Sequence, residues 1–380
     1  MKLVVFGLTV SSSWGNGHAT HWRALCRALA ELGHHVVFFE RDVPYYAEHR
    51  DLSELPGHDL RLYASWDAVR GDAGKALTDA DVAMVTSYCP DADAAATEVL
   101  QSRATVRAFY DLDTPVTLAR LDAGEHVDYL PSAGLGGFDL VLSFTGGLAL
   151  DTLRQRLGAK RVAPLYGCVD PDVHRPETPR PEFVADLSYL GTYAQDRQAK
   201  LDRLLLGAAR QRPDKRFLIG GSQYPASFTW LPNLYYVRHV APQDHAAFFS
   251  SARLTLNVTR GAMASMGWCP SGRLFEAAAC GTPIVTDAWE GLDAFFQPGL
   301  EVILAHDTAD ILAALDLGDD VRRGIGLAAR ERTLACHTGM QRARDLEAAL
   351  AGVLASTRAL CPDEAPVPVP RETVHTSIAR

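Results

Sequence analysis

Short apolar runs alternate with helical stretches along most of the chain, and this alternation limits the fold more than any other feature of the sequence. Residues 19–32 show the helical pattern clearly, because Trp22, Leu25 and Leu29 recur at helical spacing before Gly33. Strands and helices in this order form a parallel sheet that is covered on both faces. In the first half the strand-like runs are residues 3–8, 35–40, 59–63, 81–87, 105–111, 138–144 and 161–165, and further helices are expected at 91–102 and 147–157.

The alternation breaks once, near the middle of the chain. Residues 169–184 are proline-rich and have no clear period, which is typical of a linker. The alternation then resumes, so the sequence predicts an α/β protein with two doubly wound, Rossmann-like domains that face a cleft. The expected divisions are residues 1–168, residues 169–357 with terminal helices, and a short, poorly ordered tail at 358–380. Strand-like runs of the second half are residues 187–190, 215–219, 234–237, 254–258, 283–286 and 301–304, and its helices are expected near 195–209, 243–251, 271–280, 308–317, 319–335 and 340–355.

Composition and charge exclude several classes of protein. The net charge of -9, without any Lys/Arg-rich run, argues against a nucleic-acid binder. No apolar run approaches the roughly 18–20 residues that span a bilayer, and the first residues are typical of a strand rather than a signal peptide. The seven cysteines are scattered without a C-x-x-C pair, so neither a zinc site nor a disulfide framework is expected. These observations favour a cytoplasmic protein.

The segment from Ser271 to Glu276 has the pattern of an anion-binding helix start. Ser271 is a suitable N-cap, and the first turn holds Gly272 and Arg273 in place of the acidic residues that usually occur there. Glycine lets a ligand approach the free N–H groups and arginine adds donors, which suits a diphosphate. Glu276 lies one turn later and could accept hydrogen bonds from ribose hydroxyls. The alternative is that Arg273 and Glu276 pair with each other on a surface turn.

Three other loops of the second half follow predicted strands and are expected at the cleft. Gly191, Thr192 and Tyr193 follow the first strand of that half, and Gly221 follows the second. Arg260 follows the strand near residues 254–259. For the glycines alone, ordinary turn chemistry explains the pattern equally well.

At these residues the chain resembles a known family. The run SGRLFEAAACGTPIVTDAWEGLDAFFQPGLEVILA, which begins at Ser271, is similar to the donor half of GT-B glycosyltransferases, with a glycosyl transferases group 1-like donor domain, in the spore-maturation CgeB-like branch. LYGCVDPDVHRP, which begins at Leu165, resembles the crossover between the two domains of that branch. The resemblance covers residues 160–345 well.

The resemblance implies a nucleotide-sugar donor in the second domain, UDP-sugar first, and an acceptor in the first. It assigns the ribose to Glu276 and the diphosphate to the stretch from Ser271 to Arg273. One position departs from the pattern: retaining enzymes often carry a glutamate eight residues before this one, where the present chain has Trp268. The stereochemical outcome therefore stays open.

The loop at residues 9–20 supplies a candidate catalytic base. Its Gly15, Asn16, Gly17 and His18 match the dinucleotide fingerprint poorly, so an NAD-dependent enzyme is not favoured. The glycines instead present Asn16 and His18 at a helix start that faces the cleft. His18 is the preferred general base, because an ordinary imidazole pKa near 6.5 suits proton abstraction at neutral pH. The alternatives are that His18 caps the helix or binds phosphate; His21, inside the helix, is a weaker candidate.

Asp111 and Asp113 end another strand in a D-x-D pattern. In this architecture we expect no metal there; the two carboxylates would hold acceptor hydroxyls, orient a histidine or serve as the base. Thr145 and Gly146 end the strand beside the crossover, and their backbone donors are expected to line the cleft near the transferred sugar.

The sequence thus predicts a hexosyltransferase-like enzyme that moves a sugar from a nucleotide-diphosphate sugar to a small-molecule or glycan acceptor, without metal or cofactor. A nucleotide-sugar 2-epimerase of the same fold and a non-catalytic sugar-nucleotide-binding protein are the rival hypotheses. No nucleic-acid partner and no integral membrane segment are expected, and the oligomeric state is open.

Overall fold

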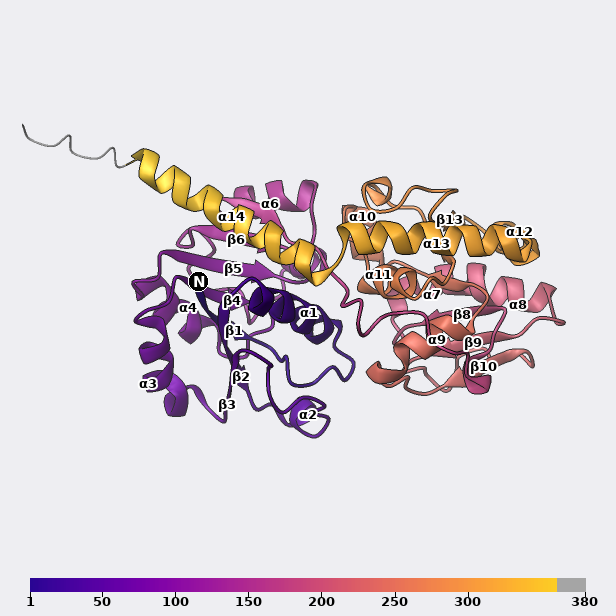
Figure 1. Ribbon diagram of the computed structural model, residues 1–380, viewed down its shortest axis with the longest axis horizontal. Coiled ribbons are helices and arrows are strands. Elements are labelled where there is room, and N and C mark those ends of the chain that lie inside the picture. The colour runs from indigo at the N-terminus through magenta and orange to yellow at the C-terminus, as the bar shows by residue number, and fades with distance from the viewer. Residues whose placement is uncertain (361–380) are drawn as a thin grey trace, which may run out of the picture.

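The structure is a computed structural model that describes residues 1–360, with side chains described to residue 355. Figure 1 shows two domains side by side, with the long C-terminal helix α14 (Gly339–Leu360) lying across the first. The tail expected at 358–380 is corrected at its start, because α14 continues to Leu360; residues 361–380 lie outside the described part of the chain. Within residues 1–360, no helix combines the length and apolar character needed to cross a membrane.

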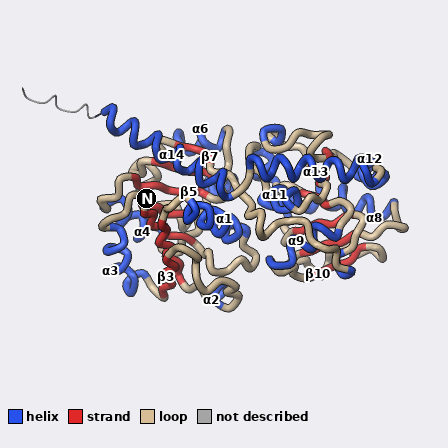
Figure 2. The backbone as a smooth tube through the Cα atoms, viewed as in Figure 1, coloured by secondary structure: helices blue, strands red, loops and turns tan. Residues whose placement is uncertain are grey.

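The first domain is built on a seven-stranded parallel sheet with the strand order β3-β2-β1-β4-β5-β6-β7. Figure 2 shows its strands gathered between helices. The elements are β1 (Lys2–Gly7), α1 (Gly17–Glu31), β2 (His35–Arg41), α2 (Pro44–Ala47), β3 (Asp59–Tyr63), α3 (Trp66–Leu77), β4 (Val82–Thr86), α4 (Ala92–Gln101), β5 (Val106–Asp111), α5 (Thr114–Asp122), β6 (Leu140–Ser143), α6 (Leu148–Leu157) and β7 (Val162–Pro164).

Continuous burial of β1, an interior strand of the sheet, explains why its sequence lacks polar alternation. Val4 and Phe6 of β1 pack into the core on one face of the sheet, and Leu3 and Val5 pack into the core on the other. A parallel strand between two helical layers must be apolar on both faces. The strand-like runs of the sequence are therefore confirmed as a doubly wound sheet.

The second domain carries a six-stranded parallel sheet with the order β10-β9-β8-β11-β12-β13. Both domains are Rossmann-like, and the predicted fold class is confirmed. The elements are β8 (Leu187–Leu190), α7 (Gln195–Leu201), the π-helical turn η2 (Asp202–Leu206), α8 (Gly207–Gln211), β9 (Phe217–Gly220), β10 (Leu234–Val237), α9 (His245–Ser251), β11 (Thr255–Asn257), α10 (Gly261–Met266), α11 (Gly272–Ala279), β12 (Ile284–Thr286), β13 (Ile303–Leu304), α12 (Thr308–Asp316) and α13 (Asp319–Cys336), with short 3-10 turns η1 (Pro181–Phe183), η3 (Pro242–Asp244) and η4 (Leu292–Ala294).

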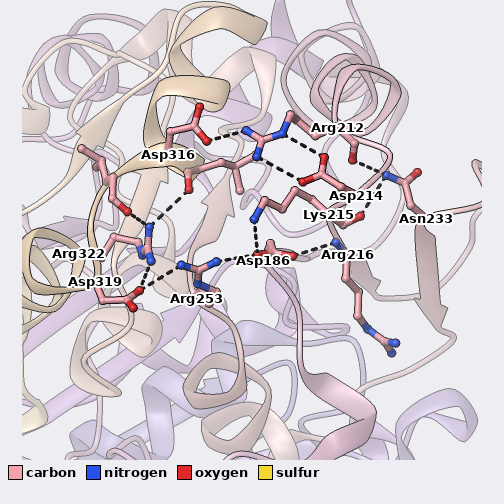
Figure 3. A network of polar contacts seen from close by, with 12 residues as sticks. Asp186, Arg212, Asp214, Lys215, Arg216, Asn233, Arg253, Asp316, Asp319 and Arg322 are labelled. Atoms are coloured by element: carbon pink, nitrogen blue, oxygen red, sulfur yellow. Dashed lines mark hydrogen bonds and ion pairs between the residues drawn. The ribbon is translucent and has the colours of Figure 1, made fainter.

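The amino ends of the second sheet are held by ion pairs (Figure 3). Asp186, just before β8, accepts hydrogen bonds from the Arg216 backbone N–H at 3.0 Å and from Arg253 at 2.9 Å. Arg212 pairs with Asp316 at 2.6 Å and with Asp214 at 3.2 Å. Since these charges neutralise one another at the edge opposite the carboxyl ends of the strands, the network is structural and leaves the other edge for ligands.

The chain crosses between the domains twice, and the two crossings are hydrogen-bonded to each other. The Val169 N–H donates to the His337 carbonyl at 3.0 Å, and the Gly339 N–H donates to the Val169 carbonyl at 3.0 Å. Gly339 approaches α1 so closely that a Cβ there would lie 2.3 Å from the Ala24 carbonyl oxygen. Any larger residue would push α14 off the first domain.

Helix α14 corrects the predicted division of the chain. We expected it to belong to residues 169–357, but it packs on the first domain, where Ala343, Leu346, Leu350 and Val353 join the core beneath α1. Their spacing forms one apolar stripe, which predicts a buried face but not which domain covers it. The prediction assigned this helix to the second domain because it follows that domain in the sequence, and this assignment was wrong.

Candidate functional site

A cavity of about 320 Å³ lies between the domains, at the carboxyl ends of both sheets. A larger hollow of about 500 Å³ lies beside residues 209–235, at the opposite edge of the second sheet. Ligands of such sheets bind beyond the carboxyl ends, so the first cavity is the candidate site. Most of the predicted site residues line it: Gly15, Asn16, Gly17, His18, Asp113, Gly191, Thr192, Gly221, Arg260, Ser271, Gly272, Arg273 and Glu276.

The start of α11 forms one wall of the cavity. Ser271 has extended backbone angles of an N-cap, and within the described residues its side chain makes no capping hydrogen bond. The first turn holds no acidic residue, and the nearest atom to a Cβ built on Gly272 is a Glu276 carboxylate oxygen at 3.8 Å. The first N–H groups of α11 and its positive dipole end are therefore free to receive an anion from the cavity.

Three arginines surround this helix start. Arg273 has a buried Nε without a hydrogen-bond partner in the described part of the chain. Arg260 pairs with Asp196 at 3.2 Å. Arg197, buried, donates to the Thr192 carbonyl, and its pKa is lowered by burial and by the charges of Arg273 and Arg260. Like charges held this close, with one carboxylate partner between them, create a site for a polyanion.

Arg197 was not predicted from the sequence. It lies in the first turn and a half of α7, the helix that follows the first strand of the second domain. The first turn of α7 contains Asp196, so this helix lacks the non-acidic first turn that identified Arg273 in α11.

Glu276 lies on the inner face of α11 and contacts two histidines. Its carboxylate is 3.6 Å from His245 Nδ1, and a ring nitrogen of His174 lies close to both. Burial alone would raise the pKa of Glu276, but His245, His174 and the charge of Arg273 together lower it to about 2. Glu276 is thus an ionised acceptor beside the anion site. The alternative pairing of Arg273 with Glu276 does not occur among the described ion pairs.

The glycine loops after β8 and β9 are packed backbone against backbone. The Gly191 N–H donates to the Gly220 carbonyl at 2.8 Å, and a Cβ on Gly221 would lie 2.1 Å from the Gly191 carbonyl oxygen. Gly221 has φ +156, so this position requires glycine both for space and for conformation. Thr192 lines the cavity, but Tyr193 does not: its hydroxyl donates to Gln195 at 2.6 Å.

On the opposite wall, Asn16 and His18 stand at the start of α1. Asn16 is the N-cap, and its Oδ1 accepts from the His18 N–H at 3.1 Å. The capping role considered for His18 therefore belongs to Asn16. Asn16 Nδ2 and His18 Nδ1 are both buried without a partner among the residues described. Burial lowers the pKa of His18, and the charge of Asp113 opposes that shift, so the imidazole is held neutral and can accept a proton.

Asp113 completes this wall. Tyr88 donates to its Oδ2 at 2.9 Å, while its Oδ1 is buried and has no partner within the described chain. Burial raises the pKa of Asp113, and His18 and Tyr88 act against that rise. His18 and Asp113 are therefore coupled groups with free acceptor atoms in one cavity.

Asp111 lies behind Asp113 and does not line the cavity. It is fully buried, and its Oδ1 accepts from the Asp113 N–H and from Thr117 Oγ1, each at 3.1 Å. Burial raises its pKa to about 6. The D-x-D pattern therefore places one carboxylate in the site and the other in its support.

Thr145 and Gly146 lie at the contact between the domains and not on the cavity surface. Thr145 Oγ1 donates to Cys269 Sγ at 3.1 Å, and the Gly146 N–H donates to the Trp268 carbonyl at 3.0 Å. Trp268 itself has φ +48, and its ring lies where a Cβ on Gly147 would be 2.4 Å away. At the position of the missing glutamate, the chain thus carries an interdomain packing residue.

Two further features of the first domain support the cavity. Glu40, at the end of β2, is buried and fixes the loop after β1 by accepting from Thr9 Oγ1 at 2.7 Å and from the Val10 N–H at 2.8 Å. His21 also lines the cavity, but its ring is hydrogen-bonded to the Tyr110 hydroxyl at 3.1 Å, and burial lowers its pKa to about 3. Sequence reasoning missed Glu40, because a carboxylate at a strand end carries no signal of its partners.

Aromatic rings of the two domains meet next to residues that line the cavity. Trp14, in the loop after β1, stacks on His49 of its own domain with ring centroids 4.1 Å apart. Its ring also lies 3.7 Å from that of His239, in the second domain. The two domains are therefore in contact beside the site, through Trp14 and His239.

Comparison with solved structures identifies the architecture. Sucrose-phosphate synthase from Thermosynechococcus elongatus matches with a TM-score of 0.68 and 16% identity, over 94% of this chain and 100% of that one. HepE of Anabaena, in complex with UDP and glucose, matches with a TM-score of 0.65 and 11% identity, over 93% and 100%. An alpha-glucosyltransferase in complex with UDP-glucose and DNA matches with a TM-score of 0.63 and 12% identity, over 92% and 99%.

The fold is therefore GT-B, as the sequence predicted. Residues 197–348 match the family model described as "Glycosyl transferase-like", a stretch that begins at Arg197 in α7 and includes all of α11. No curated protein matches the sequence. The finer resemblance to the CgeB-like branch stays a prediction.

Proposed function

We propose that the protein is a glycosyltransferase that moves a sugar from a UDP-sugar to a hydroxyl group of a small-molecule or glycan acceptor. The observation that carries the proposal is the uncapped start of α11 with Arg197, Arg260 and Arg273 around it, beside the ionised Glu276. A nucleoside diphosphate carries negative charge that would balance the arginines, and its two ribose hydroxyls can donate hydrogen bonds to a carboxylate. Two of the similar structures, HepE and an alpha-glucosyltransferase, are complexes with UDP-glucose, which favours uridine as the base.

The reaction is displacement at the anomeric carbon. The bond between that carbon and the diphosphate oxygen breaks, and the α11 N–H groups with the arginines stabilise the charge that develops on the leaving group. The acceptor oxygen forms the new bond, and its proton passes to His18. Asp113 then stabilises the imidazolium. If the acceptor hydroxyl lies nearer to Asp113 than to His18, Asp113 takes the proton in its place. Charge stabilisation by arginine and a helix terminus makes the transfer independent of metal.

The proposal has four finer points. We propose that the transferred sugar is a hexose, that the protein belongs to the CgeB-like branch, that it is cytoplasmic and that it uses no cofactor. Trp268, in place of a glutamate, leaves the retaining or inverting outcome open.

A ligand screen tests the proposal. Thermal unfolding is measured with UDP-, GDP- and dTDP-sugars and with NAD, each far above its dissociation constant; binding stabilises by about 2.7 kcal/mol at a hundredfold excess. Stabilisation by a UDP-sugar and not by NAD is expected. Incubation with candidate acceptors should then release UDP, with the sugar on the acceptor. Epimerised nucleotide-sugar without an acceptor would support the 2-epimerase, and binding without turnover on any acceptor would support a silent binding protein.

A further inference from the structure

Two histidines and a glutamate converge at the edge of the cavity from three separate segments. His174 comes from the crossover between the domains, His245 begins α9, and Glu276 lies in α11. One nitrogen or oxygen atom from each side chain lies within 4.8 Å of the other two. His174 is 2% exposed and Glu276 is 7% exposed, so this is a built, mostly buried cluster and not a chance meeting of surface groups.

The two histidines lower the pKa of Glu276, but that role leaves part of the cluster without a partner. Ribose recognition requires the carboxylate alone. His174 Nδ1 is buried and has no hydrogen-bond partner among the described residues. His245 Nδ1 is 3.6 Å from the carboxylate, which is too long for a hydrogen bond. An isolated buried imidazole nitrogen is a cost of folding that a ligand could remove.

The chemistry of the cluster fits a transition-metal ion. Two imidazoles and one carboxylate form a ligand set that Zn²⁺ uses when its fourth position stays open. Zinc bonds of about 2.0–2.2 Å place tetrahedral ligands roughly 3.3 Å apart, so rotation of the partly exposed His245 would close most of the present gap. His245 and Glu276 both line the cavity, so the fourth position would face the ligand space. The charge of Arg273 one turn away weakens attraction for a cation and makes this a moderate rather than a tight site.

We propose that His174, His245 and Glu276 bind a divalent transition-metal ion of the Zn²⁺ class, and that the bound ion excludes the donor nucleotide. The metal would take the carboxylate that the ribose needs, so Zn²⁺ and UDP compete for one side chain. The site is inhibitory, which agrees with transfer that itself requires no metal. The competition rests on the proposed function; metal binding by the free protein does not.

Calorimetric titration of the full chain with Zn²⁺, without nucleotide, tests the binding. One ion per chain is expected at this site, and His174→Ala and Glu276→Gln should each weaken binding at least tenfold. His306→Ala, at an exposed histidine of the same domain, is the matched control and should bind as the unchanged chain does. Because His174 is buried, the partly exposed His245→Gln serves as a second variant if His174→Ala fails to fold. Zinc binding that is absent, or equal in all of these variants, would overturn the site.

A second titration separates the inhibitory role from the donor role. UDP is titrated with and without saturating Zn²⁺, and its apparent dissociation constant should rise at least tenfold with the metal. Zinc binding that leaves UDP affinity unchanged would overturn the exclusion of the donor. Failure of UDP to bind the metal-free protein would count against the proposed function, while the zinc titration would still decide the metal site.

Discussion

Replacement of Arg273 by alanine tests the anion site most directly. The guanidinium stands in the first turn of α11 with a buried, unpartnered Nε, next to Arg197 and Arg260. A hydrogen bond from a charged donor to the diphosphate contributes about 1.5–3 kcal/mol. Because each 1.4 kcal/mol is tenfold, the dissociation constant for UDP should rise about 10–150-fold in Arg273→Ala.

Uridine is the matched ligand for this experiment, because it keeps the base and ribose but lacks the phosphates. Calorimetry with both ligands should show a large loss for UDP and almost none for uridine. Arg238→Ala, at an exposed arginine of the same domain, is the matched control and should bind both ligands normally. Equal losses for UDP and uridine would refute the phosphate role of Arg273.

The same variant also tests the electrostatic reasoning without any ligand. The charge of Arg273 lowers the pKa of Arg197, so the two guanidinium groups repel each other in the free protein. Removal of Arg273 relieves this repulsion but also ends its attraction to the ionised Glu276, so Tm should change little at low salt. A clear fall in Tm would show that Arg273 holds the fold together, and the weakened binding would then have a structural cause.

Three further predictions concern other parts of the site. His18→Ala should lower kcat by about 10²–10⁴-fold and leave the dissociation constant for the donor unchanged. Since burial lowers the His18 pKa, the acid limb of the pH–rate profile should lie below the ordinary imidazole value of about 6.5 and vanish in the variant. Weaker donor binding at normal kcat would instead make His18 a phosphate ligand. Gly221→Ala should lower Tm and weaken UDP binding, because overpacking of this kind costs about 1–3 kcal/mol; Gly324→Ala, where a Cβ meets open space, is the control, and an unchanged Tm in Gly221→Ala would contradict the close packing. EDTA should leave transfer intact, and activity that is lost with EDTA and restored by Mg²⁺ or Mn²⁺ would show that a metal takes part.

Local patterns predicted those parts of the site whose chemistry is contained in one short segment. The start of α11 carries its own signal, since Ser271, Gly272 and Arg273 together replace an acidic first turn. The strand–helix alternation likewise predicts a doubly wound fold, because burial on both faces forces each strand to be apolar. All residues predicted from the glycine loops after β1, β8 and β9 line the cavity, except Tyr193, whose side chain turns away.

Parts of the site that depend on tertiary contacts could not be predicted. His174 was known only as part of a crossover motif, and nothing in that segment indicates that its ring meets Glu276. Thr145 and Gly146 follow a strand as the other loops do, yet Trp268 and Cys269 cover them from the other domain. A prediction that treats each domain separately cannot show that residues of the other domain bury this loop.

The two walls of the cavity differ in charge, and this difference determines how the donor and the acceptor would be oriented in the proposed reaction. The second-domain wall is cationic, because Arg197 and Arg273 have no carboxylate partner among the described ion pairs, so in the proposed reaction a diphosphate would bind there before and after bond breaking. The first-domain wall holds His18, whose imidazole is kept neutral by burial, and Asp113, and no arginine or lysine of the described first-domain residues lines the cavity there. In the proposed reaction, the leaving group of the donor would therefore lie toward α11 and its anomeric carbon toward His18. The acceptor must approach from the first-domain side, where the loop fixed by Glu40 forms the wall.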